Sequence, residues 1–237
     1  MKIVLRSVAA AALLAAGFPG LAHADPTLVG PTPYLGASAS PFNPAGFGYF
    51  HLETFEDHLL NTPGVSADAG GVTSVVFGPS IHDSVDADDG ATDGSGLLGD
   101  SYFTGNGAAG VRFTFSEAVL GSLPTSAGIV WTDGGGGTSV AFSAFGPGGV
   151  PLLSQTLSGF ADGSNNGETA EDRFLGVVNA GGISAIFISN ASGGMEVDHL
   201  QYGGGSVAAI PEPETYALML AGLASLGFVA RRRNKRR

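Results

Sequence analysis

The chain has 237 residues, of which 43% are hydrophobic, and it contains 39 glycines, 13 prolines and no cysteine. This length and hydrophobic content suit one domain with a sizeable core, while the lack of cysteine excludes disulfides, thiolate nucleophiles and cysteine-based zinc sites. Residues 25–210 carry 19 acidic and two basic side chains. The resulting charge of −17 excludes nucleic-acid binding, because such a body repels phosphate.

Residues 1–24 have the three parts of a secretory signal peptide. A basic start is followed by an apolar stretch, and Ala22 and Ala24 form a small-x-small cleavage site before Asp25. An uncleaved membrane anchor is the alternative, but the apolar run is too short for it. We therefore predict an N-terminal signal helix that is removed, so that the mature protein begins at Asp25.

The body reads as a series of short strands. Residues 25–48 contain five prolines and little periodicity, so we expect an extended lead-in before a folded domain at 49–204. Residues 111–115 alternate between apolar and polar side chains, whereas only 53–60 suggests a helical turn. The pattern predicts an all-β fold, an antiparallel β-sandwich or jelly roll. Further strands are expected at 72–77, 129–131, 139–145, 152–157, 174–178, 183–189 and 197–202.

A first candidate calcium site lies in an acidic, glycine-bearing segment. Asp83, Asp86, Asp88, Asp89 and Asp93 fall within eleven residues, with Asp100 shortly after, and calcium prefers several oxygen ligands from a flexible loop. The segment does not match the helix–loop–helix calcium pattern, because Ala91 stands at a ligand position. The alternative is a solvated acidic loop.

A second candidate calcium site joins the two ends of the domain. The first and last strands of jelly rolls often lie side by side, which would bring Glu56 and Asp57 near Asp198. The alternative is that Glu56 and Asp57 cap a turn and that Asp198 is hydrogen-bonded within a sheet. Calcium is the one cofactor that the sequence suggests.

Catalysis has little support in the sequence. The chain has no hydrolase, phosphate-loop or dinucleotide motif, so we predict no catalytic residues. A secreted glycan-active hydrolase is the alternative; it needs two carboxylates, for which Glu117, or Glu168 with Glu171, could serve. Trp131 could stack on a sugar ring, although a single tryptophan in a strand is more typical of a core.

The tail follows a linker at 205–210 and combines a proline–glutamate motif, an apolar run and a basic end. The run 215–230 would form a helix of about 24 Å, which can span a membrane with help from flanking side chains. An amphipathic or buried helix fits less well, because the run is apolar on all sides. The basic end predicts a C-terminus that starts in the cytoplasm. The defining residues are Pro211, Glu212, Pro213, Arg231, Arg232 and Arg233.

This tail, residues 211–237, resembles the PEP-CTERM sorting signal of Gram-negative bacteria, in which a Pro-Glu-Pro tripeptide precedes a short transmembrane helix and an arginine-rich end. The resemblance implies export, transient residence in the inner membrane, and removal of the helix by an exosortase-type membrane transpeptidase. It also implies a final place at the cell surface or in the extracellular matrix.

Several segments of the body are similar to those of other secreted PEP-CTERM proteins, namely 51–65, 83–96, 171–189 and 195–203. Those bodies look like galactose-binding or related carbohydrate-binding jelly rolls. We therefore expect a non-enzymatic binding or structural role in the extracellular polymer layer, with extracellular polysaccharide as a partner.

Overall fold

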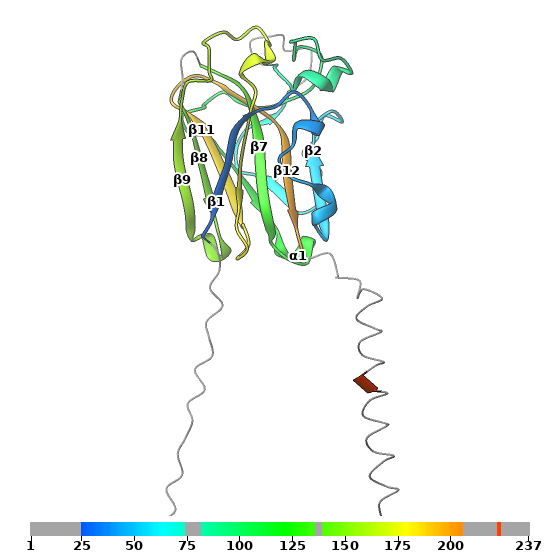
Figure 1. Cartoon of the computed structure of the whole chain (residues 1–237). Helices are drawn as coiled ribbons and strands as arrows, with labels where there is room; N and C mark the ends of the chain where they lie inside the picture. The colour runs from blue at the N-terminus through cyan, green and yellow to red at the C-terminus, as the bar shows by residue number, and fades with distance from the viewer. Residues whose placement is uncertain (1–24, 74–81, 136–138, 206–221, 224–237) are drawn as a thin grey trace, which may run out of the picture.

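The computed structural model describes residues 25–73, 82–135, 139–205 and 222–223. These residues form two antiparallel β-sheets packed face to face, which confirms the expected β-sandwich (Figure 1). No helix in this part of the chain is both long and apolar enough to cross a membrane. The expected signal helix lies outside the described residues, as does the expected tail helix apart from residues 222–223.

Sheet A has seven strands and sheet B has five, counted over the described residues. The strands of sheet A are β1 (Thr27–Pro33), β2 (Tyr49–Glu53), β4 (Gly71–Val72), β5 (Tyr102–Thr104), β7 (Pro124–Gly134), β10 (Arg173–Val178) and β12 (Met195–Gly204). Those of sheet B are β3 (Val65–Ala67), β6 (Val111–Phe115), β8 (Val140–Phe145), β9 (Pro151–Leu157) and β11 (Ala185–Asn190). The short helices are α1 (Glu117–Leu120), η1 (Ala37–Ala39), η2 (Pro44–Gly46), η5 (Asp86–Asp89), η6 (Pro147–Gly149) and η7 (Thr169–Glu171).

Strand β12 lies in the middle of sheet A. One edge pairs with β7, and the other edge pairs with β5 along its first residues and with β2 along its last residues. Neighbouring strands pair Thr27 with Val178, Val178 with Ser126, and Ser126 with Gly203. The start of β1 is therefore level with the end of β12. The sandwich therefore begins and ends at the same end of the molecule (Figure 1).

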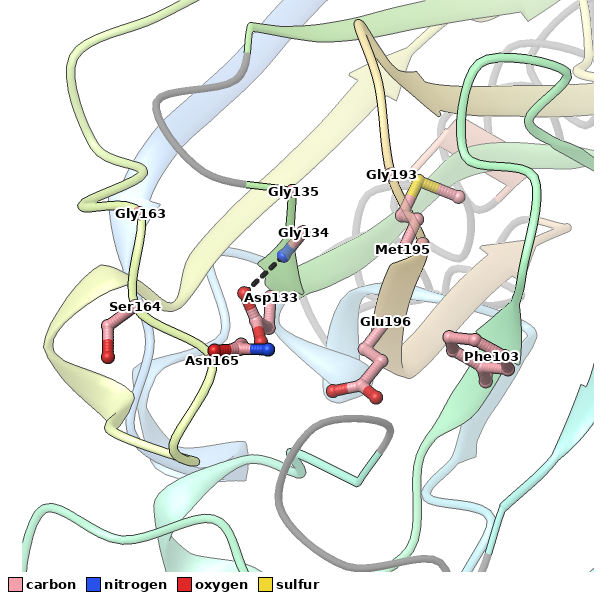
Figure 2. Close-up of a pocket in the computed structure, with 11 residues that line it drawn as sticks. Phe103, Asp133, Gly134, Gly135, Gly163, Ser164, Asn165, Gly193, Met195 and Glu196 are labelled. Atoms are coloured by element: carbon pink, nitrogen blue, oxygen red, sulfur yellow. Dashed lines mark hydrogen bonds between the residues drawn. The ribbon is translucent and has the colours of Figure 1, made fainter.

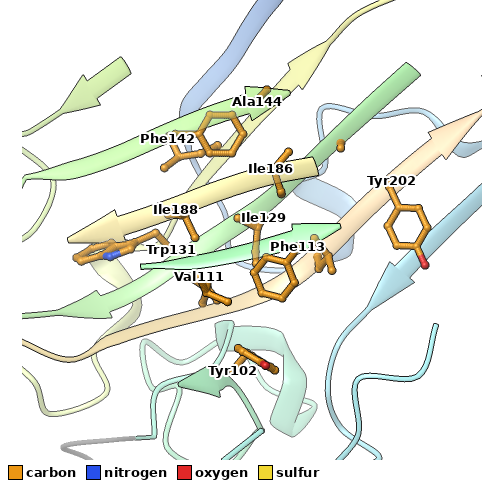
Figure 3. Close-up of a cluster of buried hydrophobic side chains, with 14 of the residues drawn as sticks. Tyr102, Val111, Phe113, Ile129, Trp131, Phe142, Ala144, Ile186, Ile188 and Tyr202 are labelled. Carbon is orange, nitrogen blue, oxygen red and sulfur yellow. The ribbon is translucent and has the colours of Figure 1, made fainter. Parts of the chain in front are cut away.

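The core between the sheets follows from the alternation of side chains along the strands. On β6, Val111, Phe113 and Phe115 are buried, whereas Thr114 between them is exposed. Trp131 is fully buried in this core, which confirms the core interpretation over sugar stacking (Figure 3). Burial of each large apolar side chain stabilises the fold by about 1.5–3 kcal/mol, and a chain without cysteine depends on this contribution.

Two local expectations differ from the structure. Residues 25–48 contain β1, which pairs with β10 at the edge of sheet A, so the sandwich begins at residue 27 and not at 49. Prolines Pro31 and Pro33 are tolerated there because an edge strand needs ladder hydrogen bonds on one side only. The helical turn expected at 53–60 is replaced by the end of β2 and a tight turn that follows it.

A smaller hydrophobic cluster covers part of the outer face of sheet A. Val130 of β7 and Phe174 of β10 contribute outward-facing side chains, and Tyr34, Phe42 and Val85 pack on them. Polar side chains that β12 directs to this outer face are therefore buried as well.

Candidate functional site

A pocket of about 310 Å³ lies at the end of the sandwich opposite Thr27 and Gly204 (Figure 2). The last residues of β7, the first residues of β12, Phe103 of β5 and the segment 163–165 form its walls. Five of the lining residues are glycines, so much of the wall is backbone. The pocket is thus built where two central, paired strands of sheet A reach their common end.

Asp133 of β7 and Glu196 of β12 face each other in the strand register, and both line the pocket. Asn190 fixes this end of the sheet, since it accepts a hydrogen bond from Trp131 Nε1 at 2.8 Å and donates one to the Gly194 carbonyl at 2.6 Å. A Cβ on Gly134 would lie 2.0 Å from Asn190 Nδ2, so only glycine fits there.

Three further carboxylates lie beside this pair, and the five together are here called the Asp83 cluster. One oxygen each of Asp83, Asp133 and Glu171 lies within 4.8 Å of the others. The charges of Asp83 and Asp133 act on Glu196, and those of Asp83 and Glu171 act on Asp172. Each member is at most 4% exposed.

The fold around Asp83 brings the cluster together. Thr132 Oγ1, on the strand that carries Asp133, donates a hydrogen bond to the Asp83 carbonyl at 2.7 Å. A Cβ on Gly96 would lie 2.2 Å from Asp83 Oδ1, so glycine is needed for this close approach. Glu171 lies at the end of η7 and accepts a hydrogen bond from the Asp162 amide at 2.8 Å.

Burial raises the pKa of every carboxyl in the Asp83 cluster, because a low-dielectric surrounding disfavours the charged form, and neighbouring carboxylates raise it further. The pKa is about 9 for Asp83 and for Glu196, about 8 for Glu171 and about 6 for Asp133. The pKa of Asp172 lies well above its ordinary value.

A second buried group comprises Asp88, Asp198 and His199, here called the Asp88 cluster, and a bulge in β12 creates it. The register against β7 shifts between Asp198 and Gln201, which leaves an extra residue in β12, and His199 there has a φ of 44°. Asp198 and His199 therefore both face outward toward Asp88, and Leu200 returns to the core.

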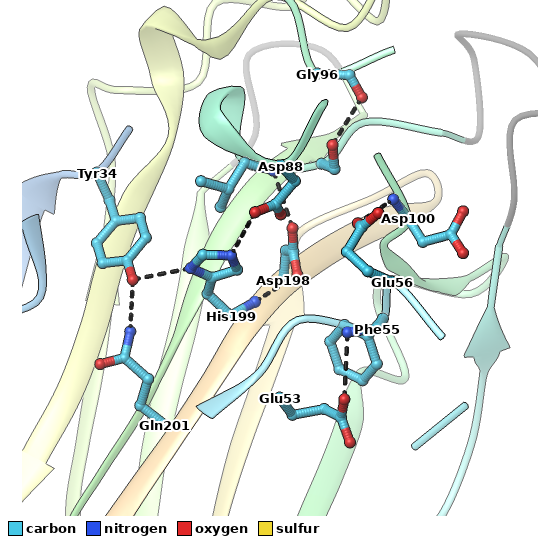
Figure 4. A network of polar contacts seen from close by, with 12 residues as sticks. Tyr34, Glu53, Phe55, Glu56, Asp88, Gly96, Asp100, Asp198, His199 and Gln201 are labelled. Carbon is cyan, nitrogen blue, oxygen red and sulfur yellow. Dashed lines mark hydrogen bonds and ion pairs between the residues drawn. The ribbon is translucent and has the colours of Figure 1, made fainter. Parts of the chain in front are cut away.

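His199 is the centre of a hydrogen-bonded chain (Figure 4). Gln201 Nε2 donates to Tyr34 Oη at 2.8 Å, and this hydroxyl lies 2.9 Å from His199 Nδ1. His199 Nε2 lies 2.8 Å from Asp88 Oδ1. All three contacts can be hydrogen bonds if the Tyr34 hydroxyl donates to His199 Nδ1 and the Nε2–H of His199 donates to Asp88.

Asp198 is fully buried, and its two oxygens accept hydrogen bonds from the amides of Val85 at 2.9 Å and His199 at 2.5 Å. Burial raises its pKa well above the ordinary value, and the charge of Asp88 raises it further. The side chains of Asp198 and His199 are buried and that of Asp88 is 9% exposed, so the Asp88 cluster forms a nearly closed hydrogen-bonded network and not an accessible catalytic group. Asp88 Oδ2 has no hydrogen-bond partner among the described residues, and one ligand atom from each of the three residues lies within 4.8 Å of the others.

The structure does not gather the aspartates of the first predicted calcium site around one point, because Asp83 lies instead with Asp133 and Glu171. Asp86 Oδ1 accepts hydrogen bonds from the three amides of residues 93–95 and so holds the loop together. Asp88 turns to His199, and Asp89 Oδ1 accepts from the amide two residues further along the chain. Calcium at this loop stays a prediction.

The second predicted calcium site is brought together in part. Strands β2 and β12 pair, as expected, and the charge of Asp88 acts on both Glu56 and Asp198. Asp57 instead caps a turn, accepting from the Leu59 amide and from Asn61 Nδ2. Calcium at Glu56 and Asp198 also stays a prediction.

Sequence reasoning missed the Asp83 cluster as a group. The sequence placed Asp83 with the aspartates of the acidic loop and Glu171 with Glu168 in a hydrolase pair, and it did not single out Asp133, Asp172 or Glu196. One signal was present: Glu196 lies inside a strand that is buried along its whole length, where an acidic side chain needs a partner.

The PEP-CTERM protein-sorting motif, as a family, matches residues 209–233. This span includes the tripeptide Pro211, Glu212 and Pro213 and the arginines 231–233 that the sequence singled out. The chain carries a PEP-CTERM sorting motif. The motif indicates an exported protein that is sorted to the cell surface. Apart from residues 222–223, the matched residues lie outside the described part of the structure, as do Ala22 and Ala24, whereas Asp25 is described and exposed.

Two solved structures are distantly similar to this PEP-CTERM chain. The C-terminal family 22 carbohydrate binding module of Clostridium thermocellum Xyn10B is 13% identical with a TM-score of 0.26, and the match covers 70% of this chain and 98% of that one. A xylan-binding domain from CBM 22 is 13% identical with a TM-score of 0.25, over 69% and 98%. At these scores the likeness adds nothing about ligands. No curated protein matches the chain.

Proposed function

We propose that the protein is exported, processed at its PEP-CTERM tail by an exosortase-type transpeptidase, and displayed or released at the cell surface, where its pocket binds an extracellular polysaccharide without catalysis. The sorting motif at residues 209–233 supports the surface address. The observation that carries the binding role is that β12 has the pocket at one end and leads to the motif at the other.

Strand β12 sets the distance between these two features. Met195 and Glu196 at its start line the pocket, and Gly204 at its end directly precedes the segment that leads to the motif. A strand of ten residues spans about 33 Å, so the pocket lies roughly that far from the point where the tail leaves the sandwich. A body held through its tail therefore keeps the pocket away from the membrane and open to polymer.

The pocket lining suits a polar ring-shaped ligand. Phe103 is half-buried and offers an apolar ring on which a sugar can pack, while Ser164 and Asn165 offer hydrogen-bond donors and acceptors. The volume of about 310 Å³ is at the lower end of small-molecule sites, which occupy about 300–1,000 Å³. We therefore expect the pocket to take a short stretch of polymer.

Binding is tested with the full chain, purified in detergent, on a glycan array and then by calorimetry with the glycan that binds best. Phe103→Ala and Asn165→Ala should each weaken binding roughly tenfold. The control is Phe187→Ala, which removes a half-buried phenylalanine of sheet B that contacts Arg112. Glycan binding that survives both pocket changes would contradict the proposal.

The tail is tested separately in cells that carry an exosortase. Glu212→Ala should leave membrane insertion intact, while the unprocessed precursor accumulates, because the tripeptide has lost its charge. Glu214→Ala is the matched control, since this glutamate lies just outside the tripeptide. If the Glu212→Ala chain were displayed normally with its helix removed, the sorting role of the tripeptide would be contradicted, and the tail would be interpreted as an ordinary membrane anchor.

A glycan-active hydrolase is the second candidate, because Asp133 and Glu196 face each other in the pocket. Glycoside hydrolysis needs two carboxyl groups whose pKa values differ, and burial raises that of Glu196 to about 9 and that of Asp133 to about 6. Turnover of chromogenic glycosides that is lost in Glu196→Gln and in Asp133→Asn would establish this candidate. Binding without turnover in the unmodified chain favours the first.

A further inference from the structure

The Asp83 cluster contains carboxylates that are buried without partners. Among the described residues, neither oxygen of Asp83, Asp172 or Glu196 has a hydrogen-bond partner. These side chains are 1%, 0% and 2% exposed, respectively. Buried carboxylates are normally hydrogen-bonded or paired with a positive charge, because an isolated buried charge is strongly unfavourable.

The described part of the chain supplies no cationic side chain that pairs with these oxygens. Its two arginines are Arg112 and Arg173, and it has no lysine. Arg112 lies on sheet B with its guanidinium 3.9 Å from the centre of the Phe145 ring. Arg173 Nη1 donates to the backbone carbonyls of Ala170 and Asp172, at 3.0 and 2.8 Å, and not to the carboxylate.

The arrangement fits a hard cation. Calcium binds six to eight oxygens at about 2.3–2.6 Å, so two of its ligands can be up to about 5 Å apart. The oxygens of Asp83, Asp133 and Glu171 that lie within 4.8 Å of one another can therefore share one ion. Zinc favours nitrogen and sulfur ligands, which the cluster lacks, and magnesium usually takes only one or two carboxylates and keeps several waters.

We propose that the Asp83 cluster binds one calcium ion between the ends of β7 and β12. Asp133 and Glu196 also line the pocket, so the ion borders it (Figure 2). The site shares only Asp83 with the calcium sites expected from the sequence, and it goes beyond the proposed function because the ion binds without any glycan. The alternative occupants of the cluster are protons, which the experiment distinguishes from calcium.

The test uses the full chain in detergent after treatment with a chelator. Trp131 is the single tryptophan of the chain and lies two residues before Asp133 on β7, so terbium in the cluster should emit light when Trp131 is excited. We expect saturable terbium emission that calcium displaces, and a thermal midpoint raised by roughly 5 °C or more in about 1 mM calcium. The absence of both in the unmodified chain would overturn the proposal and leave the cluster protonated.

Variants then locate the ion. Asp133→Asn should weaken calcium binding roughly tenfold or more, because it removes the charge from one of the three residues whose oxygens lie within 4.8 Å of one another. Glu196→Gln should weaken binding as well, because it removes a negative charge beside them. Asp133→Asn keeps the test valid if the Glu196 variant fails to fold, since Asp133 borders the open pocket. Asp89→Asn is the control; its side chain can still accept the Ala91 amide, so calcium binding should not change.

Two outcomes distinguish calcium binding at the Asp83 cluster from calcium binding elsewhere and from the proposed glycan binding. Calcium binding that survives both ligand changes would place the ion elsewhere, for example at the Asp88 cluster, and would overturn the assignment. Because no glycan is present in these measurements, a chain that binds calcium but no glycan would contradict the proposed function alone.

Discussion

The Asp83 and Asp88 clusters both bury acidic side chains from β12, yet they differ in what surrounds the carboxylates. Glu196 and Asp198 are separated only by Val197. Asp198 accepts two backbone amide hydrogen bonds, whereas neither oxygen of Glu196 has a partner among the described residues. The chain therefore supplies the carboxylate of Asp198 with hydrogen-bond donors, whereas both oxygens of Glu196 have no partner among the described residues.

The bulge in β12 explains much of this difference. It turns the His199 ring outward toward Asp88 and Tyr34, whereas in a regular strand this side chain would face the core. The imidazole therefore contacts both the Asp88 carboxylate and the Tyr34 hydroxyl. In the described part of the chain, no group donates a hydrogen bond to the carboxylates of Asp83, Asp172 and Glu196, and the nearby Asn190 donates to the Gly194 carbonyl. The two clusters differ in how many carboxylate oxygens lack a partner among the described residues: both oxygens of Asp83, Asp172 and Glu196 in one cluster, and Oδ2 of Asp88 in the other.

The largest expected effect is a loss of stability of the metal-free chain as the pH rises. Burial raises the pKa of Asp83 from 3.8, and that of Glu196 from 4.5, to about 9. Between these values the folded state holds two protons that the unfolded state has released, so folding is favoured at low pH. Stability should therefore be greatest near pH 4 to 5 and fall as the pH rises toward about 9.

Denaturant unfolding in chelator at about pH 5, 7 and 8.5 measures this slope. Excess calcium should flatten it, because an ion that binds the deprotonated cluster stabilises the folded state at high pH. Equal stability at pH 5 and 8.5 without calcium would contradict the burial of unpartnered carboxylates.

The next effect concerns the Asp88 cluster. His199→Ala removes the partner of Asp88 Oδ1 and of the Tyr34 hydroxyl, so we expect a loss of about 3 kcal/mol in the free energy of unfolding. The calcium-induced shift should remain. His51→Ala is the control, because His51 makes ring contacts with Tyr49 and Tyr202, and its replacement should cost less. If His199→Ala abolished the stabilisation by calcium, the two clusters would have to be treated as one calcium site.

Most strands of the sandwich could be predicted from the sequence, because their side chains form alternating apolar and polar patterns, as in β6 and β8, or a short apolar run, as in β10. Strands β6, β8 and β10 lie where the pattern expected them. Strand β1 was missed because an edge strand with prolines and half-exposed side chains has no clean alternation. Strands β2, β3 and β5 were missed as well; β3 and β5 have three residues each, too few for a periodic signal.

The candidate site could not be predicted from local spacing. Its residues come from positions 83, 133, 171, 172 and 196, and only the pairing of β7 with β12 brings two of them together. The sequence instead pointed to the dense run of aspartates at 86–93, where Asp86 is used by backbone amides. The high density of aspartates favoured the loop as a prediction, whereas the strand pairing of the sandwich determines which carboxylates lie close together.

A moderate effect is expected at the wall that holds Asp133. In Gly134→Ala the new Cβ would lie 2.0 Å from Asn190 Nδ2 and displace it, which should cost about 2 kcal/mol and also weaken calcium binding. Gly46→Ala is the control, since a Cβ there has no neighbour within 4 Å. Thermal unfolding with and without calcium measures both effects. Unchanged calcium binding in Gly134→Ala would show that this wall does not position the cluster.

The smallest effect is expected for Tyr34→Phe. The change leaves the ring packed against Phe174 but removes the hydroxyl between Gln201 and His199. One buried donor and one buried acceptor lose their partner, so we expect a loss of about 1–2 kcal/mol. Tyr49→Phe is the matched control; its hydroxyl donates to a single carbonyl, that of Ser122, and lies in a partly buried place, so the loss should be smaller.

The imidazole itself reports whether the Tyr34→Phe result has the proposed cause. With the hydroxyl present, Nδ1 accepts and Nε2–H donates to Asp88, which fixes one tautomer. Nitrogen chemical shifts of the His199 ring should therefore change in Tyr34→Phe and stay the same in Tyr49→Phe, while calcium binding persists in both. Ring shifts that respond to calcium but not to the loss of the Tyr34 hydroxyl would place the ion beside His199, and the contrast between the two clusters would then fail.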